Sequence, residues 1–284
     1  MNVVNKLDGI LDDFLFKKWL YGIAISVESD NLKWSGSRGN LQLDSQYFLA
    51  SATKLFTTAL ILKLVDQKCL QLHDKIVNHL DIDIPWNLHT YNGVDYSNTI
   101  TIEHLLSNSS GIPDYFKGNC EKRSLKQRII SGEDKQWSPE EAIYLSKKIT
   151  PKFPPGNRAH YSDTNFQLLQ LIIERVTGKS YFEAIQTMVA WPLELNSTYV
   201  YSDISDSRPV PLFYKNSRLN IPKAMTSFRA DGGIVSTLDE SMTFLNAFFN
   251  GKLFDPKHFS YVFQWKRIFF PGTFMSIKII WSPT

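Results

Sequence analysis

The sequence predicts a mixed α/β (α+β) fold, in which an antiparallel sheet is flanked by helices and a mostly helical domain is inserted into the sheet domain. The period of the apolar residues is helical near the N-terminus, strand-like over about residues 21–34, and helical again after residue 51. The middle of the chain shows helices and loops with almost no strand-like alternation, whereas the last residues are aromatic and β-branched. These observations assign residues 1–66 and 225–284 to the sheet domain and residues 67–224 to the helical insertion.

The N-terminal elements follow from the spacing of apolar side chains. An amphipathic helix is expected first, because six apolar residues recur at helical spacing: Val4, Leu7, Ile10, Leu11, Phe14 and Leu15. Two short apolar runs, 21–27 and 32–34, are separated by polar residues 29–31, which predicts a β-hairpin. A second, more buried helix is expected within residues 48–70, where one face carries Leu55, Ala59, Leu62 and Val65.

The later elements are predicted from helix-start and turn signals. A proline-containing segment at 152–165 precedes a long apolar helix at 166–178. The Gly-Gly pair near residue 232 predicts a turn that leads into another helix, which either Ser236 or Thr237 caps, with Glu240 three residues after Thr237. The tail from residue 261 is expected to be a strand.

The composition excludes several classes of protein. With 43% hydrophobic and 21% charged residues, the chain of 284 residues is typical of a soluble globular protein. Its net charge of +3 comes from dispersed lysines, which argues against nucleic-acid binding. Cys69 and Cys120 lack metal-site spacing and are expected to be structural.

The N-terminus has acidic residues before its apolar stretch and lysines within it. We therefore expect neither a signal peptide nor a membrane span. A cytoplasmic location is expected, although an exported chain without its leader would look the same.

A Ser-x-x-Lys tetrapeptide begins at Ser51 and is the only one in the chain. It opens a strongly apolar helix directly after an expected strand, so the serine gains the positive end of the helix dipole and free backbone N–H groups. Lys54 lies one turn later on the same face, where partial desolvation would lower its pKa and make it a candidate base. The alternative is that Ser51 only caps the helix and Lys54 lies at the surface.

Tyr161 is the second candidate, because it precedes a polar loop that begins a buried helix. A phenol held near an ammonium group can be deprotonated near neutral pH and accept the serine proton. A structural tyrosine whose hydroxyl bonds to the backbone is the alternative.

Four ordered blocks, residues 48–65, 100–115, 153–181 and 230–251, resemble the superfamily of class C beta-lactamases, D-alanyl-D-alanine carboxypeptidases and family VIII-type esterases. The resemblance covers roughly residues 20–251 and places Ser51 and Lys54 on the first motif and Tyr161 on the tyrosine of the Tyr-x-Asn motif. It implies a beta-lactamase/transpeptidase-like fold and a serine hydrolase that acts through an acyl-enzyme on a small-molecule ester, beta-lactam or peptide. No cofactor is implied.

The chain departs from that pattern at two points. Asp163 stands where the second motif usually has a substrate-binding asparagine, and an ionised carboxylate accepts hydrogen bonds but donates none. Its charge should favour the Lys54 ammonium, disfavour a Tyr161 phenolate, and make ester cleavage more secure than amide cleavage. The third motif, Lys-Thr-Gly or His-x-Gly, is absent. We therefore expect a C-terminally incomplete chain that is a poor catalyst, with uncovered apolar surface near Phe269, Phe270 and Phe274.

Other hydrolase designs fit less well. The sequence has no Gly-x-Ser-x-Gly elbow and no His-Glu-x-x-His zinc motif. No metal site is expected, and the six histidines are interpreted as solvated or structural: His73, His79, His89, His104, His160 and His258. The competing hypothesis is a catalytically impaired fragment, or a ligand-binding relative that keeps the pocket without turnover.

Overall fold

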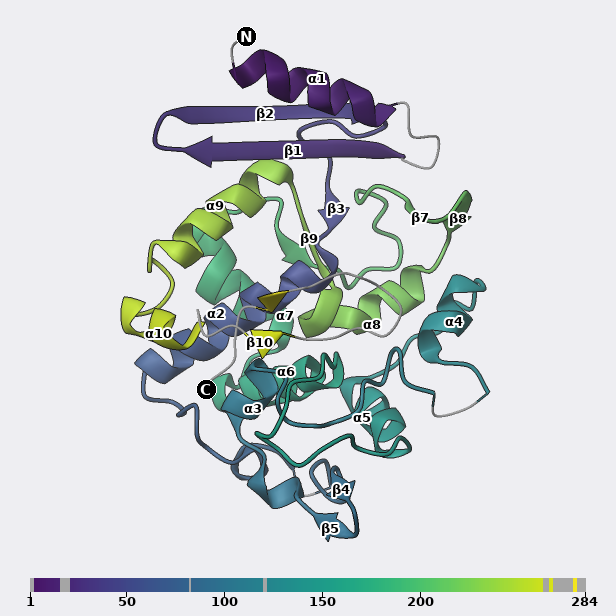
Figure 1. Cartoon of the computed structure of the whole chain (residues 1–284), viewed down its shortest axis with the longest axis vertical. Coiled ribbons are helices and arrows are strands. Elements are labelled where there is room, and N and C mark those ends of the chain that lie inside the picture. Colours follow the sequence, from purple (N-terminus) through teal and green to yellow (C-terminus); the bar gives the residue numbers. More distant parts are fainter. Residues whose placement is uncertain are drawn as a thin grey trace.

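The N-terminal part is a helix lying on a hairpin. The computed structural model describes residues 3–15, 21–81, 83–119, 122–262, 266–267 and 278–279. Helix α1 (Val3–Leu15) covers one face of strands β1 (Gly22–Ser29) and β2 (Leu32–Gly39) (Figure 1). The strands pair antiparallel from Gly22 opposite Gly39 to Ser29 opposite Leu32. Leu11 is fully buried there, and a Cβ atom on Gly36 would lie 2.7 Å from it, so the glycine makes room for this contact. The expected first helix and hairpin are confirmed.

A short antiparallel sheet joins distant parts of the chain. Its strand order is β3 (Tyr47–Phe48), β9 (Ile234–Ser236) and β6 (Tyr199–Val200). Strand β9 is fully buried between its neighbours. Within the part of the chain that the structure describes, this sheet and the hairpin are separate. Strand β6 comes from the segment expected as a helical insertion, and the division into two domains stays a prediction.

Helices form the core around helix α2 (Thr53–Asp66), as expected for the second helix. It is apolar on most sides and therefore lies inside, packed against α6 (Thr164–Thr177), α7 (Tyr181–Ile185) and α8 (Pro222–Gly232). Phe56 of α2 stacks on Phe244 of α9 (Leu238–Phe249), with ring centroids 3.5 Å apart. Each such buried side chain contributes roughly 1.5–3 kcal/mol relative to exposure.

Side-chain caps define where most surface helices begin. Thr101, Ser124, Ser138 and Ser180 each form a capping box, at the starts of α3 (Ile102–Leu106), α4 (Leu125–Ile130), α5 (Pro139–Lys147) and α7. Helix α9 begins after Thr237, whose side chain accepts a hydrogen bond from the Glu240 N–H. Of the two residues expected as caps of that helix, Thr237 is the one that caps it.

Short strand pairs and turns complete the described chain. Strand β4 (Thr90–Tyr91) pairs with β5 (Val94–Asp95), and β7 (Leu212–Tyr214) pairs with β8 (Ser217–Leu219). Short 3-10 or π-helical turns occupy Ala50–Ala52, Ile76–Asn78, Ser97–Thr99, Gln186–Ala190, Trp191–Leu193 and Pro256–His258. None of the described helices is long and apolar enough to cross a membrane.

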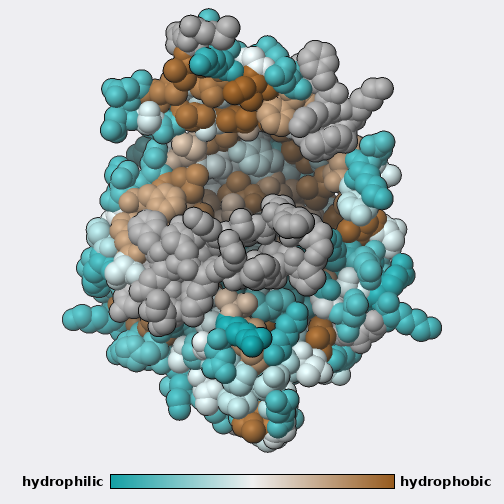
Figure 2. All heavy atoms as spheres, viewed as in Figure 1, coloured by the Kyte–Doolittle hydropathy of each residue, from teal (hydrophilic) through white to brown (hydrophobic). Residues whose placement is uncertain are grey.

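The expectation of a strand from residue 261 is wrong at its start. The Asp255 side chain accepts a hydrogen bond from the Lys257 N–H and starts a 3-10 turn that continues into helix α10 (Phe259–Val262). Farther on, β10 (Lys266–Arg267) pairs antiparallel with β11 (Lys278–Ile279). The apolar surface expected near Phe269, Phe270 and Phe274 lies outside the described residues. On the face shown in Figure 2, apolar residues gather around a hollow below the hairpin.

Candidate active site

Ser51 lies in the turn that leads from β3 into α2. Two hydrogen bonds tie this turn to β9: the Leu49 N–H donates to the Ile234 carbonyl at 2.8 Å, and the Ile234 N–H donates to Thr53 Oγ1 at 3.2 Å. Ala50 has a φ of 46°, a backbone conformation that costs free energy for any residue except glycine. The surrounding structure therefore holds the residue before Ser51 in a strained conformation, which is a feature of functional sites.

The Ser51 hydroxyl contacts Tyr161 from the opposite side of the site. Ser51 Oγ lies 2.6 Å from the Tyr161 hydroxyl oxygen. The loop that carries Tyr161 is fixed by Asn108, whose side-chain oxygen accepts hydrogen bonds from the Ser162 N–H at 3.1 Å and from Asn165 Nδ2 at 3.0 Å. Two segments that are 110 residues apart in sequence thus place their hydroxyl groups in direct contact.

Lys54 is buried beneath this pair of hydroxyl groups. Its Nζ lies 2.7 Å from Asp163 Oδ1 and donates to the Asp231 carbonyl at 2.5 Å. Burial lowers the pKa of Lys54, but the negative charges of Asp163 and Asp231 and the nearby Tyr161 outweigh burial, and the pKa is raised. The expectation that the net pKa of Lys54 is lowered is therefore wrong, because carboxyl groups from distant parts of the sequence lie beside the ammonium group.

Tyr161 is a neutral phenol in this environment. Burial raises its pKa, the Lys54 charge lowers it, and the Asp163 charge raises it again, so the net pKa is above the ordinary value. The sequence allowed a phenolate near neutral pH if the Lys54 charge prevailed, but the raised pKa disfavours it. The expected effect of Asp163 is confirmed, because its charge favours the ammonium and disfavours the phenolate.

Two further acids border the site, and the sequence reasoning missed both. Asp231 is buried, and its Oδ2 accepts hydrogen bonds from the Tyr115 hydroxyl at 2.8 Å and from Gln167 Nε2 at 3.0 Å. Burial raises the Asp231 pKa well above the ordinary value, and burial followed by the charge of Asp163 raises the Asp114 pKa to about 7. The available signal was the acid directly before the Gly-Gly pair, which was interpreted only as a turn.

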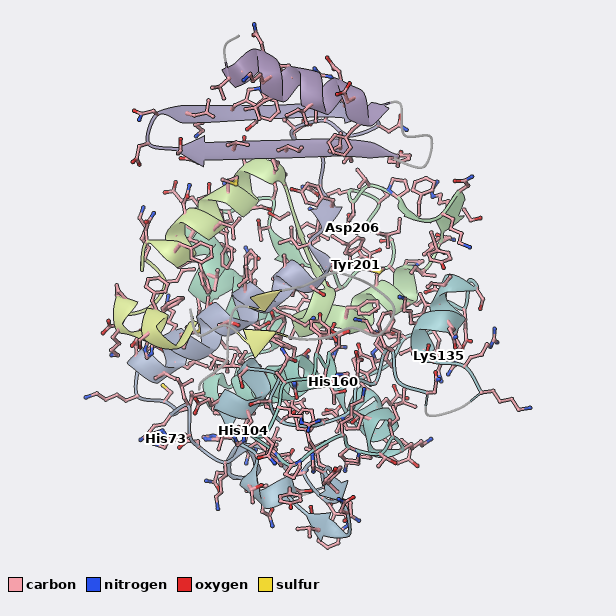
Figure 3. The ribbon with its side chains drawn as sticks, in the orientation of Figure 1. His73, His104, Lys135, His160, Tyr201 and Asp206 are labelled. Carbon is pink, nitrogen blue, oxygen red and sulfur yellow. The ribbon has the colours of Figure 1, made fainter. Side chains whose placement is uncertain are left out.

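A cavity of about 330 Å³ opens beside Ser51. Its lining is mostly apolar, with Lys117 and Lys126 among the polar residues. The apolar part consists of Phe48, Phe116, Ile129, Ile130, Leu212, Leu219, Ile221, Met225 and Phe228. A neighbouring cavity of about 240 Å³ shares five of these residues and continues toward Tyr201 and Asp206, which are labelled in Figure 3. Together they form a hollow that could hold an apolar group next to the Ser51 hydroxyl.

His160 directly precedes Tyr161 in the chain, and its N–H donates to the Asn108 carbonyl at 2.8 Å, whereas three other histidines lie away from the site. His89 is buried with its Nε2 2.9 Å from the Phe153 carbonyl oxygen, His104 completes the cap of α3, and His258 Nε2 lies 2.9 Å from Asp66 Oδ1. Figure 3 shows His73 and His104 well separated from Asp206. Among the described residues, no group of three histidine, cysteine, aspartate or glutamate side chains could hold a metal ion. Cys69 is exposed, and Cys120 lies outside the described residues.

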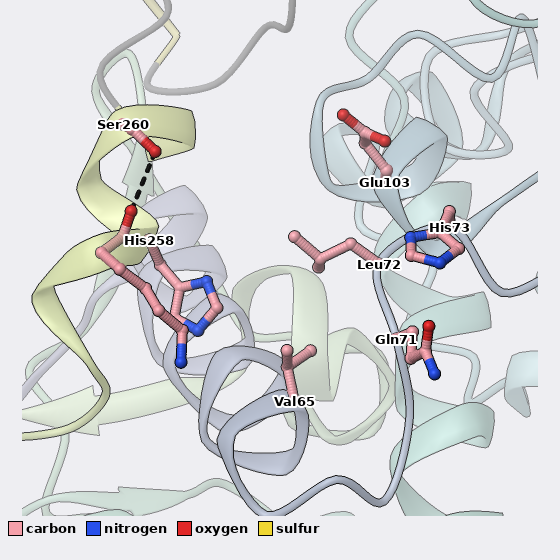
Figure 4. Close-up of a pocket in the computed structure, with 8 residues that line it drawn as sticks. Val65, Gln71, Leu72, His73, Glu103, His258 and Ser260 are labelled. Carbon is pink, nitrogen blue, oxygen red and sulfur yellow. Dashed lines mark hydrogen bonds between the residues drawn. The ribbon is translucent and has the colours of Figure 1, made fainter.

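A larger cavity, of about 510 Å³, lies at the other end of α2, beside Val65 and His258 (Figure 4). Its serine, Ser260, donates a hydrogen bond to the Lys257 carbonyl at 2.8 Å (Figure 4). Neither Ser51 nor Lys54 lines it. The cavity beside Ser51 is therefore the better candidate for a reaction at a serine.

The sequence is similar to parts of curated proteins. In curated proteins, the chain is similar to penicillin-binding protein 4* of Bacillus subtilis (strain 168), with 30% identity over 57% of this chain and 32% of that protein. It is also similar to protein flp of Staphylococcus aureus (strain MW2), with 31% identity over 54% of this chain and 28% of that protein. The matched part thus spans about a third or less of the length of these relatives.

Solved structures show the same fold. D-amino acid amidase from Ochrobactrum anthropi SV3 superposes with a TM-score of 0.75 and 23% identity, over 93% of this chain and 76% of that one. The octameric penicillin-binding protein homologue from Pyrococcus abyssi gives a TM-score of 0.76 and 24% identity, over 99% of this chain and 64% of that one. The family model described as beta-lactamase matches residues 7–274. The chain, with its mixed helix-and-strand fold, belongs to the beta-lactamase family.

Proposed function

We propose that the protein is a serine hydrolase in which Ser51 attacks an ester or amide carbonyl and forms an acyl-enzyme that water then releases. The observation that carries this proposal is the 2.6 Å contact between Ser51 Oγ and the Tyr161 hydroxyl at the start of α2, with Lys54 buried beneath it. Membership of the beta-lactamase family supports it. The Ser51 N–H would be one donor to the oxyanion.

The proposed site lies between two parts of the chain. Ser51 and Lys54 come from the sheet domain proposed for residues 1–66 and 225–284, and Tyr161 and Asp163 come from the helical insertion proposed for residues 67–224. We propose that the hairpin and the β3-β9-β6 strands belong to the antiparallel layer of that sheet domain. A cytoplasmic location stays a prediction from the sequence.

We further propose that the preferred substrate is an ester with an apolar acyl group. The cavity beside Ser51 is lined mainly by apolar side chains, which would bury such a group. Asp163 is held by the Lys54 ammonium and offers no N–H to a substrate amide, so recognition of peptides and beta-lactams is less favoured. The solved D-amino acid amidase structures include complexes with D-phenylalanine and with L-phenylalanine amide, which supports a small substrate with an apolar group but does not favour an ester over an amide.

The test compares an ester and an amide of the same acid, together with a beta-lactam. A p-nitrophenyl ester, the p-nitroanilide of the same acid and a chromogenic cephalosporin are offered to the wild type, to Ser51→Ala and to Ser202→Ala, a control at an exposed serine. We expect the ester to react fastest, Ser51→Ala to lose the reaction, and Ser202→Ala to match the wild type. Ester hydrolysis that survives in Ser51→Ala would overturn the proposal.

A second candidate function is ligand binding without turnover. The raised pKa values of both Lys54 and Tyr161 favour it, because neither group is a ready proton acceptor in the resting site. In that case the apolar acid or ester would bind in the cavity, as isothermal calorimetry would show, while the ester stays intact and no adduct forms on Ser51.

A further inference from the structure

Asn108 holds the segment that carries Tyr161 on both sides of the tyrosine. It lies in the loop after α3, and its backbone carbonyl accepts a hydrogen bond from the His160 N–H at 2.8 Å. Its side-chain oxygen accepts a second hydrogen bond, from the Ser162 N–H at 3.1 Å. Asn108 therefore bonds to the residue before Tyr161 and to the residue after it, which fixes the backbone that carries the phenol.

The same side-chain oxygen also fixes the start of α6. It accepts a hydrogen bond from Asn165 Nδ2 at 3.0 Å, and Asn165 Oδ1 in turn accepts one from the Ser110 hydroxyl at 2.7 Å. The side chains of Asn108, Ser110 and Asn165 are all buried. Because a buried donor or acceptor that loses its partner costs free energy, these contacts favour one arrangement of the two segments.

The backbone of Asn108 is in the left-handed region, with a φ of 53°. This conformation costs free energy for residues with a side chain, although asparagine adopts it more readily than most. Glycine would adopt it without that cost but has no side-chain oxygen. Asn108→Gly therefore removes the acceptor of the Ser162 and Asn165 donors without adding backbone strain.

The contact between Tyr161 and Ser51 is sensitive to the position of this segment. The two hydroxyl oxygens are 2.6 Å apart, and a displacement of about 1 Å would take them beyond hydrogen-bonding distance. Neither Asn108 nor Tyr161 lines the cavity beside Ser51. A shift of the segment should therefore affect the activation of Ser51 and leave the binding of the apolar acyl group unchanged.

We propose that Asn108 is a positioning residue for the reaction at Ser51, and that it acts by holding the Tyr161 hydroxyl against Ser51 Oγ rather than by touching the substrate. This inference rests on the proposed function of Ser51. No local pattern in the sequence marks Asn108 for this role, because the Ser162 donor lies 54 positions later in the chain.

The first experiment measures the rate of acylation of Ser51 in the intact chain. The burst of p-nitrophenolate from a p-nitrophenyl ester is recorded by stopped flow over a range of ester concentrations, for the wild type, Asn108→Gly and Asn108→Asp. We expect Asn108→Gly to lower the limiting burst rate by about tenfold or more, because a small misplacement of a reacting group is costly, and to leave the half-saturating ester concentration unchanged. Asn108→Asp keeps an oxygen acceptor and should recover most of the rate.

Asn92→Gly is the matched control for the change of backbone freedom. Asn92 is an exposed asparagine in the turn between β4 and β5, and its φ of 49° is also left-handed. Its replacement should leave the limiting burst rate unchanged. A limiting rate in Asn108→Gly that equals the wild-type rate would overturn the inference.

A double-mutant cycle with Tyr161→Phe separates positioning from a general loss of structure. If Asn108 acts through the Tyr161 hydroxyl, Asn108→Gly should slow acylation in the Tyr161→Phe background by less than about twofold, because the group that it positions is already gone. An equal loss in both backgrounds would show that Asn108 only supports the fold, and it would overturn the inference.

Urea unfolding checks that each variant is folded under the conditions of the assay. If Asn108→Gly is unfolded, Asn165→Ala takes its place in the cycle, because it removes one of the two donors to the Asn108 side chain and alanine favours the helix of α6. A wild type with no burst and no adduct on Ser51 would overturn the proposed function together with this inference. A wild-type burst with equal losses in both backgrounds would overturn the positioning role alone.

Discussion

Among the described residues, several acidic side chains lie near Ser51, although only one of them pairs with the Lys54 ammonium. Lys54 is a buried ammonium that pairs directly with Asp163 and lies near Asp231, and Asp114 in turn lies near Asp163. Burial, followed by the charge of Asp163, raises the pKa values of Asp114 and Asp231. The site therefore rests as an ammonium–carboxylate pair with a neutral phenol beside it.

At the residue scale, Tyr161→Phe should slow acylation of Ser51 by about 10²-fold or more, because it removes the hydroxyl that contacts Ser51 Oγ. The fold should be retained, since the ring keeps its place. Burst kinetics with a p-nitrophenyl ester measures the effect, and Tyr144→Phe, at an exposed tyrosine, is the control. Nearly full activity in Tyr161→Phe would make Tyr161 a structural residue.

The residues nearest the serine could be predicted, but their protonation could not. The Ser-x-x-Lys spacing and the loop before α6 identified Ser51, Lys54 and Tyr161, because those signals are local in sequence. The pKa of Lys54 is raised first by the charge of Asp163, whose effect was expected, and then by Tyr161 and Asp231. Asp231 lies 177 residues from Lys54, and no local pattern joins the two. Asp114 was missed for the same reason.

At the element scale, α9 helps to hold the start of α2, because Phe244 stacks on Phe56 and β9 leads directly into α9. Removing the cap of α9 should therefore weaken the fold. Thr237→Ala is expected to lower the free energy of unfolding by about 1 kcal/mol, since the Glu240 N–H loses its acceptor.

Urea unfolding at fixed pH measures this change. Thr243→Ala is the matched control, because Thr243 lies exposed within the same helix and bonds only to the Asp239 carbonyl. It should be neutral or slightly stabilising, given the higher helix propensity of alanine. Equal losses in both variants would show that the cap at Thr237 contributes nothing specific.

Elements with strong local signals were predicted well, and those set by distant pairing were not. The α1 helix, the β1-β2 hairpin and the Thr237 cap follow from spacing and capping residues. Strand β6 has only two residues and exists because β9 pairs with it, so nothing in its own sequence marks it. The tail residues have strand-like composition, but the turn that Asp255 starts makes Phe259–Val262 helical.

At the scale of the whole molecule, buried acids make stability depend on pH. Asp114 ionises near 3.8 when exposed but keeps its proton up to about 7 in the folded protein. Between these values the folded state binds more protons, so this contribution to stability falls as the pH rises. Burial lowers the pKa of His160 to about 4, so above that pH the folded state binds fewer protons than the unfolded state. The contribution of His160 to stability therefore rises with pH.

The difference in the free energy of unfolding between Asp114→Asn and the wild type isolates the contribution of the Asp114 carboxyl group. An amide oxygen at this position can still accept hydrogen bonds from the Phe116 and Lys117 N–H groups. We expect the variant to gain stability relative to the wild type as the pH rises from about 4 to about 7, as urea unfolding at a series of pH values would show. A difference that stays constant with pH would contradict this assignment.

The most direct test of the central claim is covalent labelling of Ser51. The wild type, Ser51→Ala and Ser202→Ala are incubated with a fluorophosphonate and, separately, with a penicillin, and intact mass followed by peptide mapping locates any adduct. The account predicts one fluorophosphonate adduct on Ser51 in the wild type and in Ser202→Ala, no adduct in Ser51→Ala, and a slower or weaker reaction with the penicillin. An adduct on another serine that persists in Ser51→Ala would contradict the account.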